Sequence, residues 1–120
     1  MEEPGTLKSP MSITYRRGKL EDLQCFRFSE DLGIAAESIE FNVVRMSHEF
    51  WIAVEDNTIL AITVLGRATS NVFTVMYLRV ANSRKGDGIG SSLIRTILDA
   101  YSSSEISVSL LLEQNSSMNA

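Results

Sequence analysis

The sequence has few of the residues that bind metals or form cross-links. Its 120 residues include one cysteine, Cys25, one histidine, His48, and two prolines. A single cysteine excludes an internal disulfide and any metal cluster built on several cysteines. Apolar neighbours in an expected helix predict a buried, unreactive thiol at Cys25. We therefore expect neither a disulfide framework nor a metal site.

Long apolar runs and an excess of positive charge are also missing. No apolar stretch approaches the ~20 residues of a membrane-spanning helix, and the N-terminus has no apolar segment typical of a signal peptide. The net charge is −4, and the aromatic residues are not framed by basic ones, which argues against a nucleic-acid groove. These absences predict a cytoplasmic protein without a membrane or nucleic-acid partner.

What the sequence does contain is enough apolar material for one small domain. The apolar fraction is 44%, which supports a packed core in a chain of this length. Pro4, Gly5 and Pro10 near the start predict a flexible leader over residues 1–11. The folded domain is therefore expected over residues 12–120.

The pattern of apolar residues predicts the order β-α-α-β-β-β-α-β and a mixed α/β (α+β) sheet. Strands are expected at residues 11–17, 50–54, 59–65, 72–80 and 106–112, and helices at 19–30, 36–46 and 88–101. Asp56-Asn57 predicts a hairpin turn, and residues 66–71 the next turn. A right-handed crossover through the last helix would place residues 106–112 parallel to residues 72–80.

A glycine-rich turn before the last helix is the most informative feature of the chain. Arg84 and Lys85 follow the strand at 72–80, and Gly86, Gly88 and Gly90 come next. A strand that leads through such a turn into a helix presents free backbone N–H groups at the positive end of a helix dipole. On an acidic chain, this local arrangement predicts a site for a small anionic ligand.

Three kinds of glycine-rich loop are possible here. The phosphate loop G-x-x-x-x-G-K-[ST] does not occur. The dinucleotide pattern G-x-G-x-x-G is matched by Gly86 and Gly88, with Ser91 in the third place and Glu113 as a possible ribose-binding carboxylate. However, residues 81–85 separate that pattern from its strand, and antiparallel hairpins precede it, which disfavours the dinucleotide fold.

The third kind fits best. The string Lys85-Gly-Asp-Gly-Ile-Gly90 resembles motif A of the GNAT superfamily of acetyl-CoA-dependent N-acetyltransferases, [Q/R]-x-x-G-x-[G/A], with lysine in place of the usual Gln or Arg. The preceding Leu78-x-Val80 and the five-residue loop also match, and Gln114-Asn115 resembles the opening of motif B. The resemblance covers residues 12–120 and implies a GNAT-like fold that lacks the family's two C-terminal strands.

The resemblance also implies a binding site for acetyl-CoA. The loop that holds the coenzyme A pyrophosphate corresponds to Gly86, Asp87, Gly88, Ile89, Gly90 and Ser91, with Lys85 beside it. The strand that pairs with the pantetheine arm corresponds to Leu78, Arg79 and Val80. Asn115 would either contact the cofactor or cap the helix of motif B.

The implied chemistry is attack of a neutral amine on the acetyl thioester, which needs a base and an acid. The position of the glutamate base in some relatives falls near Thr74, yet residues 72–80 hold no carboxylate or histidine. The family's tyrosine acid would fall beyond Ala120. Tyr77 is the candidate acid within the strand, with ordinary packing as the alternative. His48 is expected to cap a helix C-terminus or to lie at the surface, and Glu55 is expected at the surface.

The predicted function is transfer of an acetyl group from acetyl-CoA to a primary amine of a small molecule or peptide. The alternative is a non-catalytic acyl-CoA-binding or regulatory module, and this 120-residue form is expected to transfer little acetyl by itself. The apolar strand at 106–112 would be an open sheet edge, which predicts a homo-oligomer.

Overall fold

A mixed β-sheet forms the centre of the computed structural model, which describes residues 12–69, 72–101 and 105–107. The elements run β1 (Thr14–Arg17), α1 (Asp22–Cys25), β2 (Arg27–Phe28), α2 (Ala36–Met46), β3 (Glu49–Glu55), β4 (Thr58–Thr69), β5 (Val72–Val80), the 3-10 turn η3 (Asn82–Arg84), α3 (Ile89–Ala100) and β6 (Glu105–Ser107). The expected leader at 1–11 and residues 108–112 of the expected last strand lie outside the described residues.

The strands follow the order β1-β3-β4-β5-β6, and the two-residue β2 pairs separately with β4. The pairs β1–β3, β3–β4 and β4–β5 are antiparallel, whereas β5 and β6 are parallel. Because α3 connects β5 to β6, the predicted parallel crossover is confirmed. The hairpin turn at Asp56 and Asn57 is also confirmed, since both residues have the positive φ angles, 51° and 64°, that such a turn requires.

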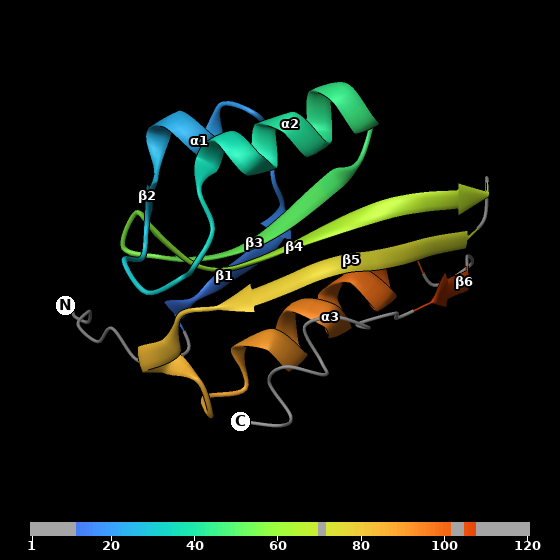
Figure 1. The fold of residues 1–120 in the computed structure, drawn as a ribbon. Helices are drawn as coiled ribbons and strands as arrows, with labels where there is room; N and C mark the ends of the chain where they lie inside the picture. The colour runs from blue at the N-terminus through green and yellow to red at the C-terminus, as the bar shows by residue number, and fades with distance from the viewer. Residues whose placement is uncertain (1–11, 70–71, 102–104, 108–120) are drawn as a thin grey trace, which may run out of the picture.

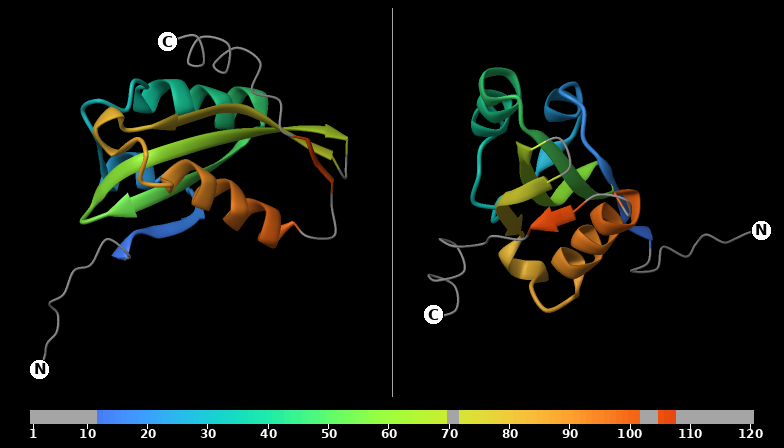
Figure 2. Two further views of the ribbon diagram at one scale, coloured as in Figure 1. Left: turned by 90° about the horizontal axis from the view of Figure 1, so that it is seen from below. Right: turned by 90° about the vertical axis from the view of Figure 1, so that its right-hand side faces the viewer.

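Helices cover both faces of the sheet (Figure 1). The helices α1 and α2 lie on one face and α3 on the other, and the right-hand view of Figure 2 shows this sandwich end-on. In β3, Phe50 and Ile52 pack in the cluster beneath α2, while Trp51 and Ala53 pack in the cluster beneath α3. A strand buried on both faces reads as a continuous apolar run, which is why residues 50–54 show no polar alternation.

An irregularity in β5 decides where its side chains point. Val64 pairs with Tyr77 but Leu65 pairs with Val75, so Met76 is an extra residue opposite β4. Val75 packs in the cluster beneath α3, and after the bulge Tyr77 packs in the cluster beneath α2. Without the bulge, the two-residue period of a strand would send both side chains to the same face.

The expected helix at 19–30 is wrong. Only Asp22–Cys25 is helical, and Phe26 is extended, with φ −109° and ψ 151°. Arg27 and Phe28 pair with the start of β4 instead. Four helical residues form too few hydrogen bonds to outweigh that sheet pairing. The expectation of a buried Cys25 is also wrong, because the short helix leaves this thiol exposed.

The expected turn at 66–71 is wrong at its start. The strand β4 continues to Thr69, since Gly66, Arg67 and Thr69 pair with residues of β5. This continued pairing satisfies backbone groups that a turn at Gly66 would leave without partners. The connection between the strands therefore lies at residues 70–71, outside the described part of the chain.

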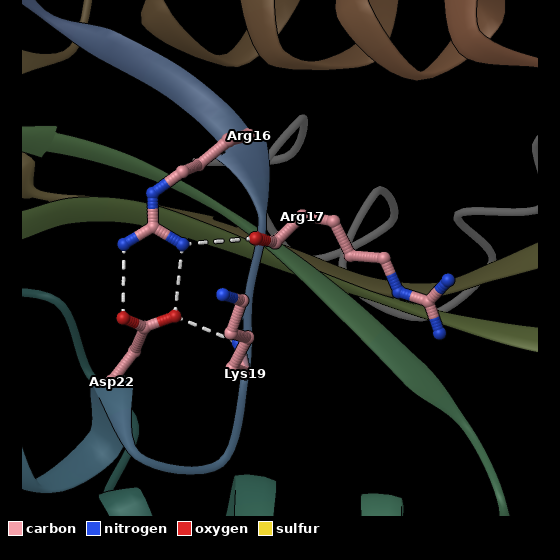
Figure 3. A network of polar contacts seen from close by, with 4 residues as sticks. All are labelled: Arg16, Arg17, Lys19 and Asp22. Atoms are coloured by element: carbon pink, nitrogen blue, oxygen red, sulfur yellow. Dashed lines mark hydrogen bonds and ion pairs between the residues drawn. The ribbon is translucent and has the colours of Figure 1, made fainter.

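A two-pronged ion pair ties the end of β1 to the start of α1 (Figure 3). Arg16 Nη1 and Nη2 each donate to the Asp22 carboxylate at 2.9 Å, and the Lys19 backbone N–H donates to the same carboxylate at 2.7 Å. Asp22 is only 6% exposed. The hydrogen bonds from Arg16 are the main reason that the pKa of Asp22 is lowered.

Replacing Asp22 with asparagine should lower the free energy of unfolding at pH 7 by about 1 kcal/mol, because the buried carboxylate loses its charge-assisted hydrogen bonds to Arg16, and solvent around the 36%-exposed Arg16 side chain weakens that pair. A lowered pKa in the folded state stabilises the fold above the ordinary pKa and ceases to do so as pH falls through the folded value. The difference in unfolding free energy between the wild type and Asp22→Asn should therefore be smaller at pH 3 than at pH 7, as measured by urea unfolding. Glu21→Gln, an exposed neighbour, is the matched control, and an equal effect of the two substitutions would contradict this account.

Candidate functional site

An open cleft of about 1290 Å³ lies where β5 ends and α3 begins. Its walls come from three parts of the chain: the segment before α2, the end of β5, and the glycine turn with the exposed side of α3. The predicted residues on these walls are Leu78, Arg79, Val80, Lys85, Gly86, Gly88, Ile89, Gly90 and Ser91. Asp87 is not on the walls, and Asn115 lies outside the described residues.

The glycine turn has the backbone geometry of an anion site. Gly86 and Gly88 have φ angles of 96° and 80°, in the left-handed region that favours glycine. No capping side chain bonds to the start of α3, and its first hydrogen-bonded N–H, that of Ser92, donates to the Gly88 carbonyl at 3.0 Å. The N–H groups of residues 89–91 therefore have no partner within the helix.

Gly90 has a different role from the other two glycines. A Cβ built at Gly90 would lie 3.2 Å from Val80 Cγ2 and 3.5 Å from Leu78 Cδ2, whereas a Cβ at Gly86 or Gly88 meets nothing within 4 Å. Gly90 thus lets the first turn of α3 pack closely on the end of β5. Glycine is therefore needed for its backbone conformation at Gly86 and Gly88, and for close packing at Gly90.

Arg84 shapes the loop through two ion pairs. Its Nη1 lies 2.8 Å from Glu55 Oε1, and its Nε lies 2.9 Å from Asp87 Oδ2. These hydrogen bonds raise the pKa of the Arg84 guanidinium, with Asp87 as the larger cause. Glu55, expected at the surface, is instead half-buried against the loop. Lys85 is exposed on the cleft wall and is the cation placed to meet an anion there.

Asp31 holds the loop to the segment before α2, and sequence reasoning missed it. The Ser83 backbone N–H donates to Asp31 Oδ2 at 2.8 Å, and Ser29 Oγ donates to Oδ1 at 2.7 Å. These contacts, led by the one from Ser29, lower the pKa of Asp31. The spacing Ser29-x-Asp31 ahead of Gly33 is a turn signal, but the partner 52 residues away could not be read from it.

The described residues of β6, 105–107, pair only with the first part of β5. Within the described residues, β6 pairs only with Val72, Phe73 and Thr74, while β4 pairs with the other edge of β5 as far as Val80. Among the described residues, none pairs with the β6 side of β5 at residues 78–80. This edge can accept an extended ligand in the manner of an added strand.

A chain of polar side chains lies on the opposite face, beneath α2. Asn42 Nδ2 donates to the Tyr77 hydroxyl at 3.2 Å, and Asn42 Oδ1 lies 3.0 Å from His48 Nδ1. The backbone N–H of His48 donates to the Asn42 carbonyl, as expected of a residue that caps a helix. The residue is half-buried, and this burial lowers the pKa of His48.

The described residues contain neither a membrane-spanning helix nor a metal-binding cluster. No helix there is long and apolar enough to cross a membrane. Residues 12–69, 72–101 and 105–107 also contain no cluster of three or more His, Cys, Asp or Glu side chains that could hold a metal ion.

Comparison with known proteins identifies the family. Residues 18–119 match the model of the acetyltransferase (GNAT) family, so the chain belongs to that family. No curated protein sequence matched the chain.

Several solved structures share the fold. A ribosomal-protein-alanine N-acetyltransferase from Brucella melitensis is similar with a TM-score of 0.66 and 14% identity, over 83% of this chain and 81% of that one. A GNAT family acetyltransferase from Staphylococcus aureus has a TM-score of 0.63 and 13% identity, over 82% and 87% of the two chains. A Brucella melitensis GNAT acetyltransferase in complex with acetyl-CoA has a TM-score of 0.58 and 19% identity, over 76% and 69%. The predicted GNAT-like mixed sheet is confirmed.

Proposed function

We propose that this protein binds acetyl-CoA in the cleft and transfers its acetyl group to a primary amine. One observation carries the proposal: two left-handed glycines lead into the uncapped start of α3, where the N–H groups of residues 89–91 have no partner within the helix, and these residues lie on the cleft wall beside the end of β5. The pyrophosphate would lie on these N–H groups, and the pantetheine arm would extend along residues 78–80.

The charges around the cleft support an anionic ligand. The protein is acidic overall, yet Arg79, Lys85 and Arg95 all lie on the cleft wall, where the carboxylates are Asp31 and Asp99. Arg84 is neutralised by Glu55 and Asp87, so the backbone N–H groups and Lys85 provide the nearest positive potential. The acetyl-CoA complex of a relative with the same fold supports the choice of ligand.

The proposed reaction has simple requirements. The amine nitrogen attacks the thioester carbonyl, a C–N bond forms, the C–S bond breaks, and coenzyme A leaves as a thiolate that takes up a proton. A strand N–H near the bulge can stabilise the oxyanion. Tyr77 remains the candidate proton donor, because its oxygen accepts from Asn42 and its own O–H can donate onward.

Coenzyme A binding can be tested with a variant that keeps the fold but repels the negatively charged ligand. Glutamate in place of Ser91 adds negative charge to the first turn of α3, which the helix tolerates well, yet it would repel the pyrophosphate. Calorimetry should show binding of coenzyme A to the wild type and none to Ser91→Glu. Lys85→Gln should weaken binding only about two- to fivefold, since an exposed charge contributes little.

The matched control adds the same charge at the other end of the same helix. Ala100→Glu lies at an exposed position away from the cleft and should bind coenzyme A like the wild type. Equal affinity of Ser91→Glu and Ala100→Glu would contradict the proposed pyrophosphate site.

Transfer distinguishes an enzyme from the second candidate function, a non-catalytic acyl-CoA-binding module. The absence of any carboxylate or histidine in β5 supports that alternative. The sequence alone predicts little transfer by this 120-residue form. The cleft leads us to expect instead that the wild type acetylates at least one of spermidine, a lysine-containing peptide and a peptide with a free N-terminal alanine, with released coenzyme A measured by chromatography. Tight coenzyme A binding without acetylation of any of the three would favour the binding module.

A further inference from the structure

Asp31 accepts hydrogen bonds from two consecutive residues of the loop that precedes the glycine turn. Its Oδ2 accepts from the Ser83 backbone N–H at 2.8 Å, and its main-chain carbonyl accepts from the Asn82 N–H at 3.3 Å. Its other carboxylate oxygen, Oδ1, accepts from Ser29 Oγ at 2.7 Å. Both carboxylate oxygens of Asp31 are thus used in contacts inside the protein, although the residue lies on the cleft wall.

These contacts cap the 3-10 turn η3 from a distant part of the chain. The first N–H groups of a helical turn have no partner within the turn, and the N-cap residue of η3, Ala81, makes no capping side-chain hydrogen bond. Asp31 takes that place from 52 residues away. The turn then continues with the Arg84 N–H, which donates to the Ala81 carbonyl at 2.9 Å, and it leads directly to Gly86.

Asp31 is itself held against the sheet through its neighbours in the chain. The Ser29 N–H donates to the Ile59 carbonyl of β4 at 3.0 Å. On the other side, Leu32 is 3% exposed and packs in the cluster beneath α2. A polar side chain whose neighbours are fixed in this way holds its own partner in a defined place. Asp31 therefore sets the position of Ser83 relative to the sheet.

Two further contacts hold the same loop from the sheet. Arg84 bonds to Glu55 at the end of β3 and to Asp87 within the loop, and the Ala81 N–H donates to the Leu60 carbonyl of β4 at 2.8 Å. The loop that enters the glycine turn is thus fixed from β3, from β4 and from the segment before α2. Donor groups that are held in place before a ligand arrives bind it more tightly, because binding does not have to order them.

The charge of Asp31 acts against the same ligand. Hydrogen bonds, led by the one from Ser29, lower the pKa of Asp31, so its carboxylate is ionised at pH 7. A negative charge on the cleft wall repels a pyrophosphate, whereas the contact with Ser83 orders the loop that would bind it. These two effects have opposite signs, and different substitutions of Asp31 can separate them.

We propose that Asp31 is a positioning residue for coenzyme A: through Ser83, it holds the glycine turn in the conformation that receives the pyrophosphate. This inference rests on the proposed coenzyme A site. Asp31 acts on the ligand only through the loop, and its direct electrostatic effect on the phosphates is unfavourable. The proposal accounts for a carboxylate on the wall of a cleft that binds an anion.

Asparagine and alanine at position 31 should change coenzyme A affinity in opposite directions. The asparagine oxygen can still accept from the Ser83 N–H, its Nδ2 can donate to Ser29 Oγ, and the negative charge is gone. Calorimetry should therefore show that Asp31→Asn binds coenzyme A about twofold more tightly than the wild type. Asp31→Ala loses the contact and should bind about tenfold more weakly. An affinity of Asp31→Asn no higher than that of Asp31→Ala would overturn the proposal.

Asp99 provides the matched control. Its carboxylate lies on the same cleft wall, carried by α3, and no hydrogen bond or ion pair of the loop within the described part of the chain involves it. Asp99→Asn and Asp99→Ala remove the same charge without touching the loop, so both should change coenzyme A affinity by the same factor. A difference between them as large as that between the two Asp31 variants would attribute the effect to side-chain size and overturn the role of Asp31.

Kinetics add a readout that a general loss of stability would not produce. The assay uses acetyl-CoA and whichever of spermidine or the two peptides the wild type acetylates. Asp31→Ala should raise KM for acetyl-CoA about tenfold and leave kcat unchanged, because the contact acts on binding of the cofactor and not on the reacting atoms. A lowered kcat at an unchanged KM would contradict a positioning role.

The outcomes separate the two proposals. If the wild type binds coenzyme A and Asp31→Ala binds it no more weakly than Asp31→Asn, the role of Asp31 is wrong and the proposed site stands. If the wild type binds no coenzyme A, the proposed function fails and the role of Asp31 fails with it. Should Asp31→Ala not fold, Ser29→Ala decides. That variant removes the donor that orients the carboxylate and should weaken binding about threefold, and a wild-type affinity would show that Asp31 does not position the loop.

Discussion

The antiparallel pairing of β4 with β5, interrupted at Met76, is the constraint on which both faces of the site depend. The extra residue reverses the alternation of β5, so that Tyr77 packs beneath α2. Leu78 and Val80 then pack toward α3, where Gly90 lets the helix approach them. In a regular strand, Tyr77 would face α3, and Leu78 and Val80 would face α2. The cleft would then lose these two residues from its wall, and Asn42 would lose its contact with Tyr77.

The charged and polar groups near the cleft fall into two sets: those that hold the loop in shape and those available to a ligand. Arg84 is tied to Glu55 and Asp87, and Asp31 accepts from the Ser83 backbone, so the charged groups nearest the loop stabilise its shape. The N–H groups at the start of α3 have no partner within the helix and are available to the proposed ligand. An acidic protein can bind a pyrophosphate in this way because oriented backbone dipoles act at short range and do not depend on net charge.

Local patterns predicted much of this structure, and contacts between distant residues account for what they missed. The apolar run of β3, the periodicity of α3 and the glycine turn are encoded in neighbouring residues, so their positions were predicted. The strand at Arg27–Phe28 depends on pairing with β4, and the contact of Asp31 with Ser83 spans 52 residues. The orientation of His48 likewise depends on Asn42 and Tyr77, and no spacing rule links those three positions.

The central claim is that the glycine turn and the adjoining edge of β5 form one binding surface for coenzyme A. Titration of the 15N-labelled protein with coenzyme A, followed through its backbone amide NMR signals, tests this most directly. The account predicts large shifts for the amides of residues 86–91 and 78–80, and little change in β1 (Thr14–Arg17), which lies at the other side of the sheet. Shifts that avoid residues 86–91, or that spread evenly over the sheet, would contradict it.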